Sequence, residues 1–339
     1  MSKAWSRQSV VEKVIGDRKA PAREASVAFA PANIALCKYW GKRNEVLNLP
    51  VTSSLSISLG ALGSHCRLSP CSGSDQVTLG GETLEGEHPF VERIRDYLNL
   101  FRPDPEQSYK IEAINTVPTA AGFASSASGF AALVLALDGL HGWGLSLREL
   151  SILARLGSGS ACRSLWQGLV EWHVGSATDG MDSYGEPLGD TWDELRVGLL
   201  VLEAGKKPIG SRPAMKRTVE TSPGYAVWPD RVAHDLANLK AAIAAKDFER
   251  LGEAAESNAL AMHATMIMAQ PPVLYWKAAS VTAMNDVWAA RRDGVSLYFT
   301  MDAGPNIKLL FTAADEAAVV ERFPALRVTA PALRPAEEA

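Results

Sequence analysis

The fold is decided by one stretch of the chain, Asn115-Thr-Val-Pro-Thr-Ala-Ala-Gly-Phe-Ala-Ser-Ser-Ala-Ser-Gly-Phe-Ala-Ala-Leu-Val-Leu-Ala-Leu137. It begins with strand-like residues, becomes a run of small side chains from Ala124 to Gly129, and continues as an apolar helix. Such a loop lets backbone N–H groups approach an anion, and the helix N-terminus adds partial positive charge. No lysine follows at the Walker position. The local sequence is therefore compatible with phosphate binding and, equally, with a tightly packed helix start.

Two further clusters on either side of this stretch combine small residues with cations. Lys38-Tyr-Trp-Gly-Lys-Arg43 follows an apolar run, and it is either a solvated turn with extended lysines or a loop that presents cations to an anion. Gly157-Ser-Gly-Ser-Ala-Cys-Arg163-Ser is a second candidate anion cradle, in which Arg163 is able to bind a phosphate or carboxylate through two hydrogen bonds.

The stretch from Lys206 to Arg217 carries five cations in twelve residues. A charge run of this kind is usually solvated surface. Here proline, glycine and serine interrupt it, which favours a loop that meets a phosphate.

A candidate catalytic carboxylate lies near the C-terminus. Val295 to Asp302 alternates apolar and polar side chains as a half-buried strand does, and Ala303-Gly-Pro-Asn306 then turns the chain toward a partner strand at Ile307 to Phe311. Asp302 thus sits at the tip of a predicted hairpin, which is a rigid mount for a carboxylate. An aspartate that merely caps the turn is the alternative interpretation.

The remaining periodicity predicts a mixed α+β protein. A strand is expected at Leu55 to Leu59, hairpins over 60–88, and a helix opened by the capping-box pattern Ser146-Leu-Arg-Glu149. Further helices are expected at about 89–101, 230–245, 247–262 and 272–292. The length of 339 residues suggests two domains. We expect a leader over 1–24, an N-terminal domain over 25–204, a C-terminal domain over 205–330 and a tail over 331–339, with the boundary at Ala204-Gly205.

Composition excludes several classes of function. A formal net charge of −4 argues against bulk nucleic-acid binding, which needs a cationic field over many phosphates. The four cysteines lack paired metal-ligand spacing and are expected to be free thiols. The N-terminus has no apolar signal core, and no apolar run approaches the ~18 residues of a membrane span. We therefore expect a cytoplasmic protein with no membrane partner.

Together these stretches resemble the GHMP kinase superfamily, and within it the diphosphomevalonate decarboxylases. The loop Pro118 to Gly129 is similar to the superfamily's phosphate loop. The narrower resemblance covers about Val27 to Phe311 and rests, in order and spacing, on Ala30-Pro-Ala-Asn-Ile-Ala, Lys38-Tyr-Trp-Gly-Lys-Arg43, Leu49-Pro-Val-Thr-Ser-Ser-Leu-Ser56, Gly157-Ser-Gly-Ser-Ala-Cys-Arg163 and Asp302-Ala-Gly-Pro-Asn306. The sequence departs from the family pattern at Met301, where phenylalanine is common, and in its longer leader.

The resemblance implies a GHMP kinase fold of two α/β two-layer domains, with the site in the cleft between them. It implies that Asp302, Lys38 and Arg163 are catalytic. It also implies that the substrate and its diphosphate contact Tyr39, Lys42, Ser158, Ser160, Arg163, Ser211, Arg212 and Met215. The expected contacts of the nucleotide are Gly122, Ala124, Ser125, Ser126, Ser128, Lys206 and Lys207. The protein ligands of Mg²⁺ are not assigned.

The implied reaction is the ATP- and Mg²⁺-dependent decarboxylation of (R)-5-diphosphomevalonate to isopentenyl diphosphate by a homodimer. Three alternatives stay open at the level of sequence: a decarboxylase of the monophosphate, a small-molecule kinase of the same superfamily that stops at the phosphate ester, and a catalytically inactive ligand sensor. The cations around Arg212 favour two phosphates, and the set of Asp302, Lys38 and Arg163 favours decarboxylation over simple phosphorylation.

Overall fold

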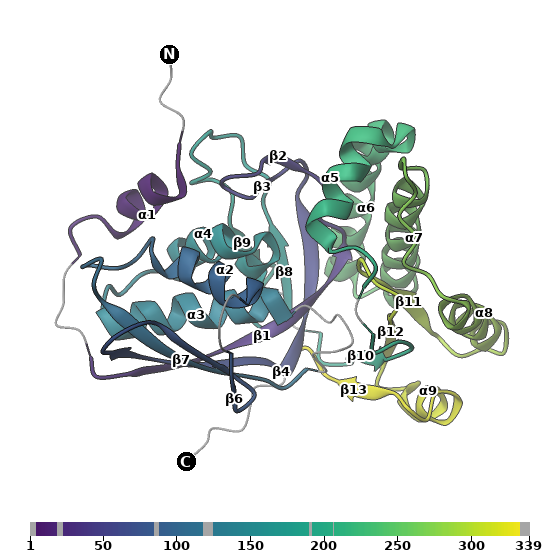
Figure 1. Ribbon diagram of the computed structural model, residues 1–339. Helices are drawn as coiled ribbons and strands as arrows, with labels where there is room; N and C mark the ends of the chain where they lie inside the picture. The colour runs from purple at the N-terminus through teal and green to yellow at the C-terminus, as the bar shows by residue number, and fades with distance from the viewer. Residues whose placement is uncertain are drawn as a thin grey trace.

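The computed structural model describes residues 5–18, 23–84, 88–117, 125–189, 192–205 and 207–332. It has two halves, each built from a β-sheet with helices packed against it (Figure 1). This is the mixed α+β architecture that the sequence predicts. None of the helices in the described ranges is long and apolar enough to cross a bilayer.

The first half is built on a seven-stranded sheet in the order β6-β5-β7-β4-β8-β9, with β1 paired to β4. Its strands are β1 (Ser26–Cys37), β4 (Ser54–Cys71), β5 (Gln76–Leu79), β6 (Glu82–Thr83), β7 (Ser108–Asn115), β8 (Leu169–Trp172) and β9 (Gly185–Pro187). A short ribbon of β2 (Lys42–Asn44) and β3 (Leu49–Pro50) follows β1 and carries the expected cation cluster.

The prediction of hairpins is wrong for residues 60–71. Strand β4 continues through Gly60 and Gly63 as one strand of 18 residues. Both ends of β1 pair with it in antiparallel register. A Cβ atom at Gly63 would lie 2.1 Å from the carbonyl oxygen of Ala30, so the glycine admits the close approach of β1 instead of making a turn. The expected hairpin does form farther along, between β5 and β6.

The described residues of this half form the helices α1 (Arg7–Ile15), α2 (Pro89–Leu98), α3 (Ser125–His141) and α4 (Leu147–Gly157). Helix α4 runs into the 3₁₀ helix η2 (Gly159–Arg163). Helix α3 packs on β1 and β4, and α4 lies beside α3 (Figure 1). The predicted capping box of α4 is present, with Ser146 and Glu149 each bonding the other's backbone N–H. The leader over 1–24, for which the sequence assigns no defined role, contains α1, and Val10, Val11 and Val14 of this helix are buried.

The second half has a four-stranded antiparallel sheet in the order β11-β12-β10-β13. Its elements are β10 (Leu195–Leu200), α5 (Ser211–Thr221), η3 (Pro223–Val227), α6 (Trp228–Ala245), α7 (Phe248–Ile267), α8 (Ala278–Arg292), β11 (Tyr298–Thr300), β12 (Ile307–Thr312), α9 (Glu316–Arg322) and β13 (Arg327–Thr329). Strands β11 and β12 pair as the predicted hairpin. Helix α8 begins six residues later than the expected start at 272, after the extended segment in which the Tyr275 hydroxyl donates to the carbonyl oxygen of Ile209.

The position of β10 bears on the domain boundary. This strand hydrogen-bonds to β12 and β13 of the second sheet, although it precedes the boundary expected at Ala204-Gly205. We therefore propose a boundary before Leu195. The two halves also contact each other through β13, where the Thr329 hydroxyl donates to the carbonyl oxygen of Leu59 at 2.9 Å.

Candidate active site

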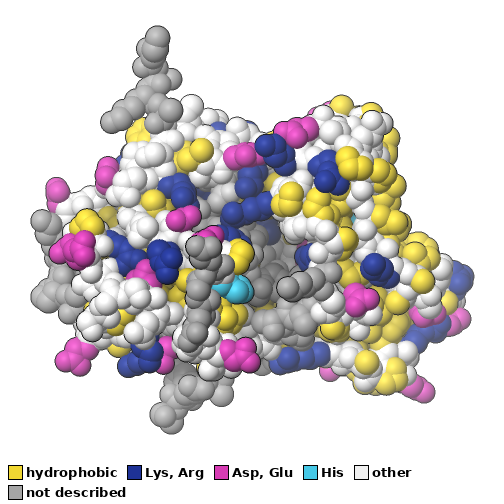
Figure 2. All heavy atoms as spheres, viewed as in Figure 1, with side chains coloured by type: hydrophobic (Ala, Val, Ile, Leu, Met, Phe, Trp, Pro, Cys, Tyr) yellow, Lys and Arg dark blue, Asp and Glu magenta, His cyan; other side chains and the backbone are white. Residues whose placement is uncertain are grey.

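A cavity of about 460 Å³ lies where the end of β1, η2, the start of α5 and the β11–β12 turn converge. Figure 2 shows Lys and Arg side chains gathered along the hollow between the two halves. The cavity brings together twelve of the residues expected at the site, namely Lys38, Tyr39, Lys42, Ser126, Ser158, Ser160, Arg163, Lys207, Ser211, Arg212, Met215 and Asp302. Segments that are far apart in the sequence thus form one polar cleft.

The Asp302 carboxylate is held between two lysines. Its Oδ1 lies 3.0 Å from Nζ of Lys38, and its Oδ2 lies 3.1 Å from Nζ of Lys308. Lys38 also donates to the carbonyl oxygen of Ala35 at 2.6 Å, and its side chain is almost fully buried. His263 also contacts the β11–β12 turn, because its Nε2 lies 3.1 Å from the carbonyl oxygen of Asp302. The carboxylate is therefore immobilised at the floor of the cleft.

Burial and charge act in opposite directions on this cluster. Burial alone would raise the pKa of the Asp302 carboxyl, but the ammonium groups of Lys308 and Lys38 outweigh it and hold that pKa well below its usual range. Burial lowers the pKa of Lys38 to about 8, although the charge of Asp302 opposes this shift. Asp302 is thus an ionised, weakly basic carboxylate at neutral pH, and Lys38 titrates within reach of it.

Arg163 lies in the same cavity on η2 and is anchored from behind. Its Nε donates to Oδ1 of Asn33 at 3.3 Å, and a terminal nitrogen donates to the hydroxyl of Ser54. Asn33 in turn donates to the Ser164 hydroxyl at 2.7 Å. These neutral partners orient the guanidinium without neutralising it, so its charge remains for a ligand.

A second group of cations lines the outer part of the cleft, on β2, α2 and α5: Lys42, Arg93 and Arg212. Burial, followed by the charge of Arg212, lowers the pKa of Lys42 to about 8 and also lowers the pKa of Arg93. Such mutual repulsion is relieved when an anion binds. The buried hydroxyl of Tyr39 has no hydrogen-bond partner among the described residues, and it lines the same space. The outer cleft therefore has the donors that a phosphate group requires.

The residues expected to contact the nucleotide divide into three sets. Ser126, in the first turn of α3, and Lys207 line the cavity. Ser128 faces the sheet instead, fully buried with its Oγ 2.7 Å from Oγ of Ser64. Ser125 is the first residue of α3, while Gly122, Ala124 and Lys206 lie outside the described residues.

The described donor set suits a nucleotide-bound magnesium ion better than a protein-bound one. No group of three or more His, Cys, Asp or Glu side chains positioned to hold a metal occurs in the described ranges. The start of α3, the Ser126 hydroxyl and the Lys207 ammonium instead offer donors and positive charge to phosphate oxygens. Magnesium commonly binds through substrate phosphates with few protein ligands, and this arrangement fits that mode.

Three functional candidates were missing from the sequence-based set. Lys308 is buried in the apolar strand Ile307-Lys-Leu-Leu-Phe311, and a lone lysine in such a run was the available signal. Asn33 precedes an apolar run and supports Arg163. Arg93 is an exposed-looking cation of an amphipathic helix, and nothing in its local sequence distinguishes it from a solvated residue.

The two α+β halves form a cleft between them that is lined by cations, includes the N-terminus of α3 and contains an ionised carboxylate. This architecture is that of a GHMP-type fold with an anion-binding site. Residues 30–185 match the model of the diphosphomevalonate decarboxylase-like N-terminal domain, and residues 197–331 match that of the mevalonate 5-diphosphate decarboxylase C-terminal domain. The chain belongs to the diphosphomevalonate decarboxylase family.

Individual relatives in sequence and structure support the same family. The diphosphomevalonate decarboxylase of Eremothecium gossypii is 36% identical over 311 residues, covering 85% of this chain and 78% of the relative. The human enzyme is 36% identical over 320 residues, covering 87% and 78%. The crystal structure of mevalonate diphosphate decarboxylase from Staphylococcus aureus matches with a TM-score of 0.86 at 37% identity, over 92% of this chain and 97% of that one. A structure of MDDEF in complex with MVAPP, AMPPCP and magnesium matches with a TM-score of 0.85 at 41% identity, over 90% and 96%.

The lysine pKa values predict an alkaline limit on activity. Lys38 and Lys42 both have pKa values of about 8, so each loses its charge as the pH rises through that value. We expect kcat/KM for the phosphorylated substrate to fall above about pH 8 with the loss of two protons, since kcat/KM reports the free enzyme. Arg stays protonated there, so Lys42→Arg should make the fall shallower, to one proton. A profile that stays flat to about pH 10 in the unaltered chain would contradict these assignments.

Proposed function

We infer that this chain catalyses the ATP-dependent decarboxylation of (R)-5-diphosphomevalonate to isopentenyl diphosphate, with release of ADP, phosphate and CO₂. The observation that carries this conclusion is the ionised Asp302, locked by Lys38 and Lys308 in a cleft lined with anion-binding groups, in a chain of this family. ATP and Mg²⁺ are its cosubstrate and cofactor, in keeping with the ATP binding and the AMPPCP and magnesium named for its structural relatives.

The chemistry explains why ATP is consumed. The substrate has a tertiary hydroxyl beta to a carboxylate, and hydroxide is a very poor leaving group. Transfer of the γ-phosphoryl group to this oxygen, with loss of its proton, creates a phosphate ester. Cleavage of the C–O bond then expels phosphate, and the electron pair of the breaking C–C bond forms the alkene as CO₂ departs. The protein must align these groups and stabilise the changing charge.

We propose that Asp302 aligns the tertiary hydroxyl and accepts its proton as phosphorus is attacked. Its lowered pKa makes it a weak base, which suits phosphoryl transfer because most of the catalysis there comes from positioning and charge stabilisation. Lys38 balances the charge of Asp302 and of the departing phosphate. Lys308, on the opposite side, holds the second carboxylate oxygen and so fixes the direction of Oδ1.

We propose that Arg163 binds the substrate carboxylate, since its planar fork matches that group and its supports leave the charge unpaired. In the outer cleft, Lys42, Arg93 and Arg212 bind the diphosphate, aided by Tyr39, Ser158, Ser160, Ser211 and Met215, which line the same cavity. The depth of the cleft thus separates the reacting end of the substrate from its diphosphate end.

ATP phosphates would bind at the start of α3, to Ser126 and Lys207 among the described residues. Contacts of Gly122, Ala124, Ser125 and Lys206 with the nucleotide remain predictions, and so does one for Ser128, whose described hydroxyl partner is Ser64. When bound, Mg²⁺ neutralises phosphate charge and orients the terminal phosphoryl group. Ser126, Lys207 and the N-terminus of α3 supply donors that position those phosphates.

The family also implies a homodimer in the cytoplasm, and we propose both for this chain. The four cysteines are unpaired, which suits a reducing compartment. Static light scattering of the purified chain should give twice the 36.3 kDa mass of one copy, and a monomer mass at micromolar concentration would contradict the dimer.

Replacement of the carboxylate tests the catalytic assignment. We expect Asp302→Asn to reduce turnover by about a hundred- to ten-thousandfold, because the hydroxyl loses its proton acceptor while the shape of the cleft is kept. ATP binding, measured by calorimetry, should persist. The matched control is Asp286→Asn on α8, where the side chain is exposed. A near-normal rate of ADP and CO₂ release from Asp302→Asn would disprove the role.

Replacement of Arg212 tests the location of the diphosphate. Loss of a charge-assisted hydrogen bond should raise KM for diphosphomevalonate about ten- to a hundredfold in Arg212→Ala, with a much smaller change in KM for ATP. Arg217→Ala is the control, because Arg217 lies on the same helix and does not line the cleft. An equal rise in both KM values would contradict the assignment of Arg212 to the diphosphate.

The same assay with mono- and diphosphate substrates distinguishes a decarboxylase of the monophosphate from the diphosphomevalonate decarboxylase proposed for this chain.

A further inference from the structure

The leader helix α1 is fixed to the body of the first half. Val10, Val11 and Val14 are buried in the core cluster that includes α4. Nζ of Lys13 lies 2.7 Å from Oδ2 of Asp179, and a terminal nitrogen of Arg18 lies 2.7 Å from Oε1 of Glu149. The helix therefore holds its first residue at a defined place.

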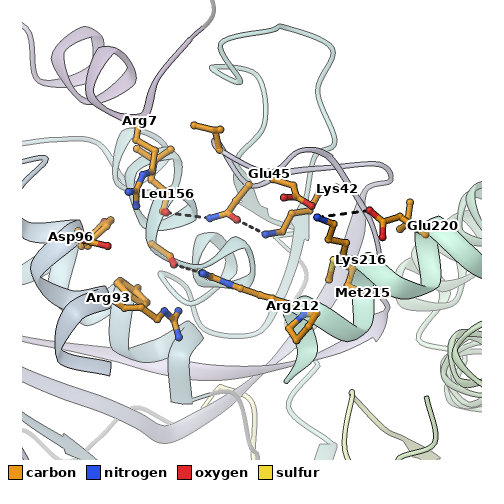
Figure 3. A pocket seen from close by; sticks show the side chains of 17 residues that line it. Arg7, Lys42, Glu45, Arg93, Asp96, Leu156, Arg212, Met215, Lys216 and Glu220 are labelled. Carbon is orange, nitrogen blue, oxygen red and sulfur yellow. Dashed lines mark hydrogen bonds and ion pairs between the residues drawn. The ribbon is translucent and has the colours of Figure 1, made fainter. Parts of the chain in front are cut away.

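That place is the rim of a second cavity of about 540 Å³, which adjoins the cleft. The two cavities share Lys42, Asn48, Arg93, Arg212, Pro213 and Met215. Figure 3 shows Arg7 at the end of α1, across this cavity from Arg93 and Arg212. Leu156, Tyr97 and Phe130 also line this cavity. The cations that we assign to the diphosphate therefore lie between the reacting centre and Arg7.

The charges in this outer cavity are unbalanced. Among the residues that the structure describes, five cations and three carboxylates line it. Lys216 is close to Glu220, with 3.8 Å between Nζ and Oε1. Arg7 and Arg93 have no ion pair with a carboxylate among the described residues, and Arg93 lies over the ring of Phe130 at 5.4 Å. An anionic group in the cavity would thus meet uncompensated guanidinium groups.

The stability of α1 does not explain an arginine at this position. Arg7 is the first residue of the helix, where the helix dipole disfavours a cation, and the first turn contains no acidic residue. The helix is capped without it, through the reciprocal bonds of Ser6 and Ser9. The dipole and the guanidinium instead add their positive potentials at the same rim.

We propose that Arg7 is a further substrate-binding residue, which attracts and retains the diphosphate end of the substrate at the mouth of the cleft. This inference rests on the proposed function, because a diphosphate is the anion that the adjoining Lys42, Arg93 and Arg212 are assigned to hold. A rim cation acts chiefly on association and on its salt dependence. The leader is therefore part of the binding site and not only a packed cap.

The test compares variants of the full chain that separate binding from folding. Arg7→Gln should raise KM for diphosphomevalonate about three- to tenfold and weaken its dependence on KCl, with kcat and KM for ATP unchanged. Arg7→Glu should raise that KM further while Tm stays equal or increases, since an acid suits the first helical turn. Arg7→Lys should preserve much of the affinity.

The matched control is Gln8→Glu, an exposed position in the same turn that changes net charge by the same amount as Arg7→Gln. It should leave both KM values unchanged. The inference is overturned if Arg7→Gln leaves KM for diphosphomevalonate unaltered, if it raises KM for ATP equally, or if Gln8→Glu has the same effect. Absence of CO₂ release from diphosphomevalonate by the unaltered chain would instead refute the proposed function itself, so the two failures are distinguishable.

Discussion

The structure depends on one ionic arrangement, in which the Asp302 carboxylate is shared by Lys38 and Lys308. Lys38 directly follows β1 of the first sheet, whereas Asp302 and Lys308 belong to the β11–β12 hairpin of the second. A buried ammonium group without a counter-ion is costly, so Lys38 requires the second half to be docked where Asp302 can reach it. The same contact thus joins the two halves and places the reactive carboxylate at the floor of the cleft between them.

This arrangement also decides which chemistry the site performs well. Two lysines keep Asp302 ionised and make it a weak base, which suits orientation of a hydroxyl more than abstraction of a proton before phosphoryl transfer begins. Arg163 is supported by Asn33 and Ser54, and its charge is left for the ligand. Farther out, the crowded cations at Lys42 and Arg212 favour the most highly charged part of the substrate. Position along the cleft and sign of charge therefore specify the same orientation of the substrate.

The parts of the fold and of the site that depend on local sequence could be predicted. The alternation before Asp302 and the turn after it predict the hairpin, and the small residues before α3 predict a helix start that opens on the site. Pairings between distant segments were not predictable. Gly63 looks like a turn residue, yet it lets β1 pass over a continuous β4. Lys308 acquires its role only because the hairpin brings it back beside Asp302.

The most direct test is a crystal structure of the chain with diphosphomevalonate and an unreactive ATP analogue. The account predicts that the tertiary hydroxyl of the substrate lies within hydrogen-bond distance of Asp302, with its carboxylate at Arg163 and its diphosphate among Lys42, Arg93 and Arg212. A complex in which Asp302 contacts Lys38 and Lys308 but the hydroxyl binds elsewhere would contradict it.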